Sequence, residues 1–133
     1  MSEQNSFLQA VRGLRPEKTP VWFMRQAGRS LPEYRRLRTG NDMLTACTTP
    51  GLAAEITLQP VRRYGVDAAI FFSDIVTPLY LAGLKVEIVP GKGPVFADPI
   101  LSPKDVDRLT SFKSFDSSCI TEAAQMVCAE LGD

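Results

Sequence analysis

The sequence predicts an α/β fold in which two buried parallel strands are joined by a helical crossover. Two apolar runs, residues 21–24 and 66–72, have the length and composition of buried strands. The stretch between them shows helical periodicity and is long enough for the right-handed crossover that joins parallel strands. Polar residues follow each run directly, as they do at the carboxyl ends of strands in α/β proteins, where ligands bind.

The first third of the chain contains two short helices around the first strand. Apolar residues at helical spacing predict an amphipathic helix over residues 5–14, which Pro16 ends. The strand at 21–24 follows it. A second helix begins at Pro32, because proline suits the first turn of a helix, and it ends at Gly40.

A long helix is expected to lead to the second strand. Asp42 can cap a short helical turn before it, and the run Thr-Thr-Pro at 48–50 is a typical helix start. The apolar pattern continues to Gly65, where the helix should stop. Pro60 lies inside this pattern, and we expect it to kink or divide the helix, because proline lacks the backbone N–H.

The last third of the chain predicts a hairpin and two helices. Residues 85–89 alternate in polarity, a Pro-Gly-Lys-Gly-Pro turn follows at 90–94, and residues 95–96 return as the second strand. A short helix starts at Ser102-Pro103. Apolar positions between Ile120 and Leu131 recur at helical spacing, and Gly132 is a natural C-cap.

The composition is that of one globular domain in a reducing compartment. The 133 residues are 44% hydrophobic and 23% charged, and fifteen basic residues balance fifteen acidic ones, which argues against a nucleic-acid surface. No stretch approaches the roughly 20 apolar residues of a membrane span, and no secretory signal is evident. Three cysteines without a Cys-x-x-Cys pair predict reduced thiols and a cytoplasmic protein. Histidine is absent, and no metal site is expected.

The first strand ends in a loop suited to binding an anion. Arg25 and Arg29 flank Gln26, Ala27 and Gly28, and the glycine lets the backbone approach a ligand closely. Each guanidinium can bind a carboxylate or phosphate through two parallel hydrogen bonds. The alternative is that both arginines pair with acidic residues or cover the surface, and the residue pattern alone favours neither interpretation.

Asp74 stands at the corresponding position after the second strand. Because neighbouring parallel strands end at the same edge of a sheet, we expect Asp74 to lie near the arginine loop. The alternative is that Asp74 caps a helix beginning at Ile75, a role worth about 1 kcal/mol. Tyr34 and Arg38 are four residues apart on the second predicted helix and share one of its faces.

The chain resembles the uroporphyrinogen decarboxylase family in several motifs. The run at 20–29, Pro-Val-Trp-Phe-Met-Arg-Gln-Ala-Gly-Arg, followed by Leu-Pro-Glu-Tyr-Arg at 31–35, is similar to the N-terminal motif of that family. Residues 58–64, 67–74 and 89–94 are similar to it as well. The resemblance implies a single-domain (β/α)8 TIM barrel, usually a homodimer and cytosolic in bacteria. It also implies a carboxy-lyase that converts the four acetate side chains of uroporphyrinogen III to the methyl groups of coproporphyrinogen III without a metal or organic cofactor.

The resemblance also implies roles for the candidate residues. Arg25 and Arg29 would be catalytic residues that bind carboxylates of the tetrapyrrole, and one of them could also serve as the acid that protonates the ring. Asp74 would accept hydrogen bonds from pyrrole N–H groups and stabilise a cationic intermediate. The cleft would be lined by further candidates, namely Gln26, Ala27, Gly28, Tyr34 and Arg38. The family's remaining active-site tyrosine, serine and histidine occur later in its sequence, so no position here corresponds to them.

A barrel of this type needs typically about 250 residues, so residues 1–133 are expected to be the N-terminal part of one TIM-barrel domain, truncated before barrel closure. Such a chain should be inactive alone, and the apolar stripe of the last helix should be left uncovered by other elements. Two alternatives are a zinc- or corrinoid-linked methyltransferase of the same superfamily and an inactive tetrapyrrole- or anion-binding fragment.

Overall fold

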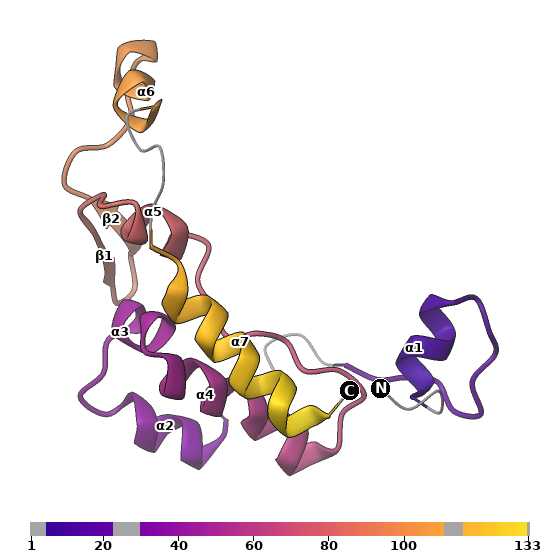
Figure 1. Ribbon diagram of the computed structural model, residues 1–133. Coiled ribbons are helices and arrows are strands. Elements are labelled where there is room, and N and C mark those ends of the chain that lie inside the picture. The colour runs from indigo at the N-terminus through magenta and orange to yellow at the C-terminus, as the bar shows by residue number, and fades with distance from the viewer. Residues whose placement is uncertain (1–4, 23–29, 111–115, 133) are drawn as a thin grey trace.

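The computed structural model describes residues 5–22, 30–110 and 116–132, in which three helices lie around a central helix and a two-stranded hairpin packs on one of them (Figure 1). The elements in chain order are α1 (Ser6–Val11), α2 (Pro32–Arg38), α3 (Met43–Thr48), α4 (Pro50–Tyr64), α5 (Thr77–Leu81), β1 (Val86–Val89), β2 (Gly93–Phe96), α6 (Pro103–Thr110) and α7 (Ser118–Leu131). No helix among the described residues is long and apolar enough to cross a membrane.

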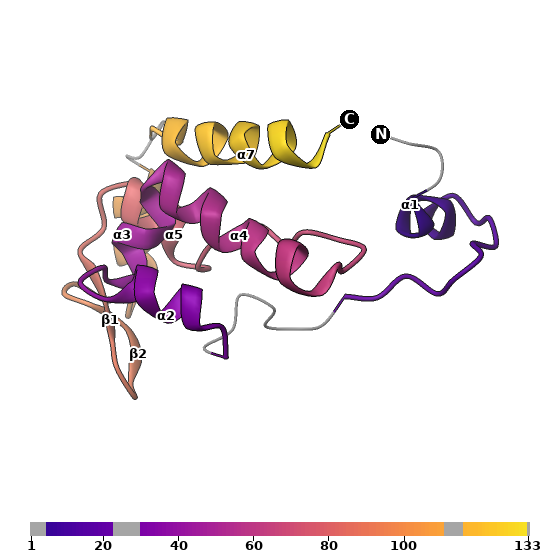
Figure 2. The same ribbon diagram turned by 90° about the horizontal axis from the view of Figure 1, so that it is seen from below.

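Helix α4 is the centre of the packing. Helix α7 lies along one side of α4 and α2 lies on the other side (Figure 2). Between α4 and α7, a small cluster forms from the buried side chains of Ala54, Leu58 and Val127. Helix α4 begins with Pro50 in its first turn and ends at Gly65, whose φ of 60° is the left-handed conformation that favours glycine.

A second cluster joins α2, α3 and α4 to the segment that follows α4. Its buried members are Leu31, Tyr34, Ala46, Cys47, Ile56 and Phe72. The rings of Tyr34 and Phe72 meet edge to face with their centroids 6.1 Å apart. This contact holds the end of the 66–72 run against α2.

The predicted hairpin is confirmed. Strands β1 and β2 pair antiparallel with Val86 opposite Phe96 and Val89 opposite Gly93, so β2 begins two residues earlier than expected. Gly91 turns the chain with a φ of 76°. The hairpin packs on α3 and on the residue before α5 through a third cluster, which consists of Leu44, Val76, Val86, Ile88 and Phe96.

The predicted strand at 66–72 is not formed. Among the described residues, its backbone pairs with the first predicted strand only at Val21, whose carbonyl accepts the Asp67 N–H at 3.1 Å. A parallel strand requires hydrogen bonds along its whole length. Ile70 is 47% exposed, so the run is not buried on both faces. Val21 and Trp22 are not in a strand either, and residues 23–24 lie outside the described residues.

Two further expectations need correction. Pro60 does not divide α4, which runs unbroken from Pro50 to Tyr64, whereas the expected kink stays a prediction. A proline removes only one N–H from this helix, and the residues from Ile56 to Pro60 are all buried against its neighbours. The apolar stripe of α7 is also covered in part, because Ala123 is buried and Val127 packs with Ala54 and Leu58 of α4, while Leu131 remains 47% exposed.

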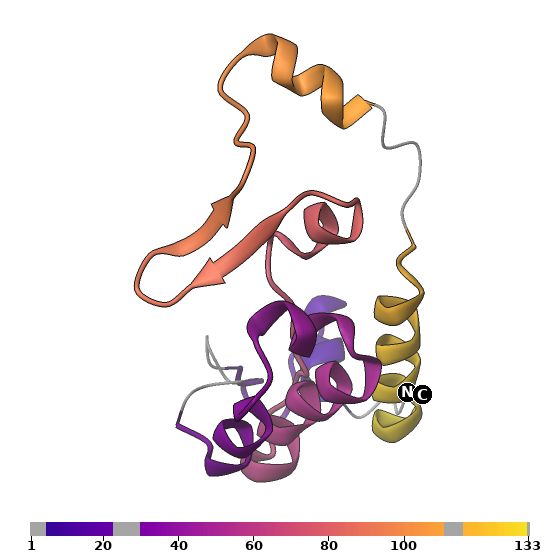
Figure 3. The same cartoon turned by 90° about the vertical axis from the view of Figure 1, so that its left-hand side faces the viewer.

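Helices α1 and α6 lie at opposite ends of the molecule (Figure 1). The side chain of Asn5 caps α1, which ends at Val11 rather than near Leu14, by accepting the N–H groups of Phe7 and Leu8. Helix α6 stands beyond the hairpin and α5 (Figure 3). Within the described part of the chain, no other helix or strand packs extensively against α6.

Candidate functional site

The candidate anion loop, which comprises Arg25, Gln26, Ala27, Gly28 and Arg29, lies outside the described residues. Its flanks are described, and they contact the two ends of the 66–72 run. On the N-terminal side, Val21 donates its N–H to Oδ2 of Asp67 at 2.8 Å. On the C-terminal side, Leu31 is 1% exposed and belongs to the same cluster as Phe72. The two flanks of the loop therefore lie beside the two ends of the run that leads to Asp74.

Asp74 forms a tight turn before α5. Its Oδ1 atom accepts the N–H of Val76 at 3.0 Å, and its backbone carbonyl accepts the N–H of Thr77 at 3.0 Å. This arrangement agrees with the capping alternative, with the difference that the carboxylate caps the turn ahead of α5 and Val76 is the N-cap residue. The Oδ2 atom of Asp74 accepts no hydrogen bond within the described part of the chain, so this half-buried carboxylate keeps one oxygen for another partner.

Tyr34 lies in the interior. Its side chain is 8% exposed and packs on Phe72, so its ring belongs to the hydrophobic core. Arg38, one turn further along α2, is half-buried, and its Nη1 atom donates to the backbone carbonyl of Asp42 at 2.6 Å. The side chain of Arg38 therefore closes the α2–α3 connection in this structure.

Asp74 and Arg38 both lie close enough to the thiol of Cys47 to influence its pKa. Burial is the main cause that raises this pKa above its usual value, and the negative charge of Asp74 raises it further. A hydrogen bond from Thr77 and the positive charge of Arg38 oppose the increase. The thiol of Cys47 therefore lies where α2, α3 and the turn at Asp74 meet. The sequence did not single out Cys47, because a cysteine within a short apolar helix indicates only burial.

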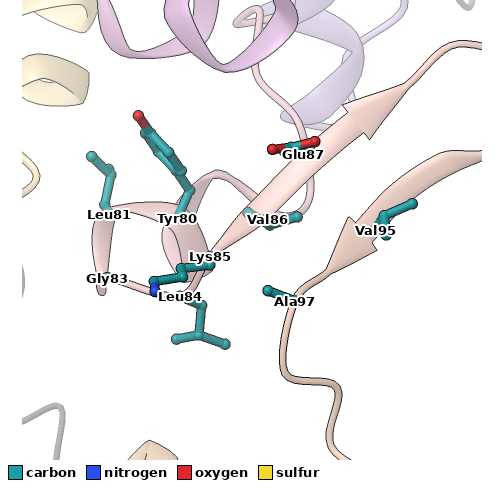
Figure 4. A pocket seen from close by; sticks show the side chains of 9 residues that line it. All are labelled: Tyr80, Leu81, Gly83, Leu84, Lys85, Val86, Glu87, Val95 and Ala97. Atoms are coloured by element: carbon teal, nitrogen blue, oxygen red, sulfur yellow. The ribbon is translucent and has the colours of Figure 1, made fainter.

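Two of the open grooves among the described residues lie close to other elements. One, of about 720 Å³, lies between α5 and the hairpin (Figure 4) and is lined by Tyr80, Leu81, Gly83, Leu84, Lys85, Val86, Glu87, Val95 and Ala97. The other, of about 640 Å³, lies between α1, α4, α7 and residues 66–71. Neither groove is lined by Asp74, Tyr34 or Arg38. In the same parts of the chain, no three His, Cys, Asp or Glu side chains gather as a metal ion would require.

Residues 2–133 match the family described as "Uroporphyrinogen decarboxylase (URO-D)". Proteins named uroporphyrinogen decarboxylase from Leifsonia xyli subsp. xyli and Corynebacterium diphtheriae are each 53% identical over 100% of this chain. The protein of that name from Salinispora tropica is 55% identical over 95% of this chain. The matched regions cover 37%, 38% and 34% of those three proteins, so the chain spans little more than a third of their length.

Proposed function

We propose, because the chain belongs to the uroporphyrinogen decarboxylase family, that its residues serve the decarboxylation of the four acetate side chains of uroporphyrinogen III to give coproporphyrinogen III. The observation that carries this proposal is the identity of more than half the residues to proteins of that name over the whole chain. The position of Asp74 supports it, because this carboxylate follows the 66–72 run and its Oδ2 atom has no hydrogen-bond partner among the described residues.

The proposed role of Asp74 is electrostatic. A pyrrole acetate loses CO2 readily once a proton on the ring makes that ring an electron sink. The electron pair of the C–C bond then moves into the ring, CO2 leaves, the new exocyclic methylene takes up a proton to become a methyl group, and the ring proton is released. A fixed carboxylate stabilises the cation formed in the first step and accepts hydrogen bonds from pyrrole N–H groups.

The proposed role of the arginine loop is to bind substrate. Uroporphyrinogen carries eight carboxylates, and the guanidiniums of Arg25 and Arg29 match carboxylates through paired hydrogen bonds. Gln26, Ala27 and Gly28 would line the cleft with backbone. The described flanks of the loop support its placement near Asp74, because Leu31 and Phe72 share one cluster. Tyr34 and Arg38 would support the cleft from α2 rather than line its floor, since the ring of Tyr34 is buried.

The proposed architecture follows the family. Residues 1–133 would form the N-terminal part of a single (β/α)8 TIM-barrel domain in a cytoplasmic homodimer, and the missing strand pairing at 66–72 is consistent with an incomplete barrel. No cofactor is needed for the chemistry described above. The isolated chain would be inactive, because the family's remaining active-site groups correspond to no residue of it. The methyltransferase alternative is less well supported, since residues 2–133 match the uroporphyrinogen decarboxylase family.

The test is the Asp74→Ala substitution in the complete enzyme. Removing the counter-charge should reduce the rate of CO2 release by about 10²- to 10³-fold, the range that follows loss of one electrostatic contact to a transition state. Asp116→Ala is a matched control, because Oδ1 of Asp116 also accepts the N–H two residues ahead, from Ser118 at 2.8 Å, but at the start of α7. That variant should keep the wild-type rate. Near wild-type turnover by Asp74→Ala would refute the assignment.

The isolated chain provides a second test. Residues 1–133 should release no CO2 from uroporphyrinogen in an anaerobic assay. Saturable binding of the tetrapyrrole by this chain without CO2 release, together with an inactive complete protein, would favour the anion-binding alternative over decarboxylation.

A further inference from the structure

Two buried threonine hydroxyls hold the backbone on either side of the turn at Asp74. The first, Thr57, lies on α4 and is 2% exposed. Its Oγ1 atom donates to the carbonyl of Ala53 at 2.7 Å and accepts the N–H of Phe72 at 2.9 Å. Because the single hydroxyl hydrogen is used within the helix, the lone pairs of Oγ1 remain for the amide of Phe72. Helix α4 is thereby bonded directly to the residue two positions before Asp74.

The second hydroxyl belongs to Thr77, the first residue of α5, which is fully buried. Its Oγ1 atom accepts the N–H of Asp74 at 3.3 Å and lies 3.4 Å from Oγ of Ser73. The backbone N–H of Thr77 returns a bond to the carbonyl of Asp74 at 3.0 Å. The backbone of Asp74 is thus held at both its N–H and its carbonyl by one residue, while Val76 holds one carboxylate oxygen.

We propose that Thr57 and Thr77 are positioning residues, which act through the backbone at Phe72 and Asp74 to present the second carboxylate oxygen of Asp74 in a fixed direction. The inference rests on the proposed function of Asp74. The physical reason is that a catalytic carboxylate displaced by a fraction of an ångström loses much of its effect on a developing charge. Neither threonine needs to touch the substrate.

A threonine on α3 shows the purely structural use of such a hydroxyl. Thr48 on α3 is half-buried, and its Oγ1 atom donates to the carbonyl of Leu44 at 2.8 Å, which is the same bond to the preceding turn that Thr57 makes. Thr48 accepts no backbone N–H from residues 72–77. It therefore provides a control that loses a helical hydroxyl without releasing the turn at Asp74.

The experiment compares valine and serine at both positions in the complete enzyme, with kcat and KM measured well below the melting temperature. Valine matches the shape of threonine without its hydroxyl, whereas serine retains the hydroxyl. Thr57→Val and Thr77→Val should each reduce kcat by about tenfold with KM within about twofold of wild type, because the turn moves without loss of substrate contacts. Thr57→Ser and Thr77→Ser should recover kcat to within about threefold of wild type, and Thr48→Val should leave it unchanged.

The kinetic results either support or overturn the positioning role of the two threonines. Wild-type kcat in both valine variants, or loss of kcat that serine does not restore, would overturn the positioning role. A similar loss in Thr48→Val would also overturn it, because any buried hydroxyl would then matter. These results leave the proposed function intact if Asp74→Ala is inactive. If Asp74→Ala is itself fully active, the proposed function and this inference are both refuted.

Discussion

Arg62 on α4 binds Glu130 on α7 through two parallel hydrogen bonds. The Nε atom of Arg62 donates to Oε1 of Glu130 at 2.5 Å, and Nη2 donates to Oε2. The remaining nitrogen, Nη1, donates to Oε2 of Glu55 at 2.7 Å. This ion pair therefore joins two helices that pack along each other, and it raises the pKa of Arg62 and lowers the pKa of Glu130. Both side chains are about half exposed, so screening by solvent limits how much the ion pair stabilises the fold.

The first prediction concerns pH and this ion pair. The folded-state pKa of Glu130 is lowered by its bonds to Arg62, so its contribution to stability is present above the usual pKa of glutamate and is lost as pH falls through the lowered value. We expect Glu130→Gln to lower the melting temperature modestly at pH 7, and by less in strongly acidic buffer or in 1 M salt.

The control for this ion pair is on the same helix. Glu122 forms no ion pair within the described part of the chain, so Glu122→Gln should leave the melting temperature unchanged. Thermal unfolding followed by circular dichroism measures both variants. An equal effect of the two substitutions at pH 7, or no dependence on salt, would show that the bond to Arg62 adds nothing to stability.

The second prediction is that Thr57→Val destabilises the fold. The substitution leaves the N–H of Phe72 buried without its acceptor, which costs about 1–3 kcal/mol. Urea unfolding should show a lower midpoint with an unchanged slope. Thr48→Val removes only a bond to a carbonyl that already belongs to α3, and we expect an effect of less than about 0.5 kcal/mol. The prediction is wrong if the two valine variants are equally stable.

The third prediction concerns thiol reactivity. Cys47 is 1% exposed and its pKa is raised by burial, whereas Cys128 is exposed on α7. Because the thiolate is the reactive form, an aromatic disulfide reagent at pH 7.5 should modify Cys128 first and Cys47 only after unfolding. Mass spectrometry of peptides after a timed reaction identifies the modified residue. Modification of Cys47 at the rate of Cys128 in the folded protein would contradict the structure.

The fourth prediction concerns α6. The carboxylate of Asp105 accepts the N–H groups of Leu101 and Ser102, so α6 has a capped start. The helix has eight residues and no extensive packing among the described elements, and such a helix is only marginally stable in water. Backbone amides of α6 should therefore exchange with deuterium at least about a hundredfold faster than those of α7, which packs on α4. Equal protection of the two helices would show that α6 is docked.

Helix boundaries could be predicted because their signals are local. Pro32 begins α2, Asp42 accepts the N–H of Thr45 and begins α3, and Gly65 ends α4 in the left-handed conformation. The hairpin was equally predictable from alternation and a glycine turn. By contrast, the prediction of a strand at 66–72 was wrong for the described residues. A strand forms only where a second strand pairs with it, and among the described residues only Val21 of the first predicted strand provides a backbone partner.

The candidate site was predictable only in part. The position of Asp74 after the second apolar run was visible in the sequence, and the structure adds that one carboxylate oxygen caps a turn. The roles assigned to Arg25 and Arg29 stay predictions, since both lie outside the described residues. The contributions of Thr57 and Thr77 could not be predicted, because a threonine in a helix has the same sequence signal whether its hydroxyl is solvated or bonded to a distant amide.

By itself, the sequence determined the family, the extent of most helices, the hairpin and the placement of an aspartate after an apolar run, because each depends on residues close together in the chain. Only the tertiary structure decided that α7 covers α4, that Tyr34 is buried against Phe72, and that two threonine hydroxyls hold the turn at Asp74. Those features depend on contacts between distant residues, where burial removes water and each backbone N–H must find an acceptor in the folded chain.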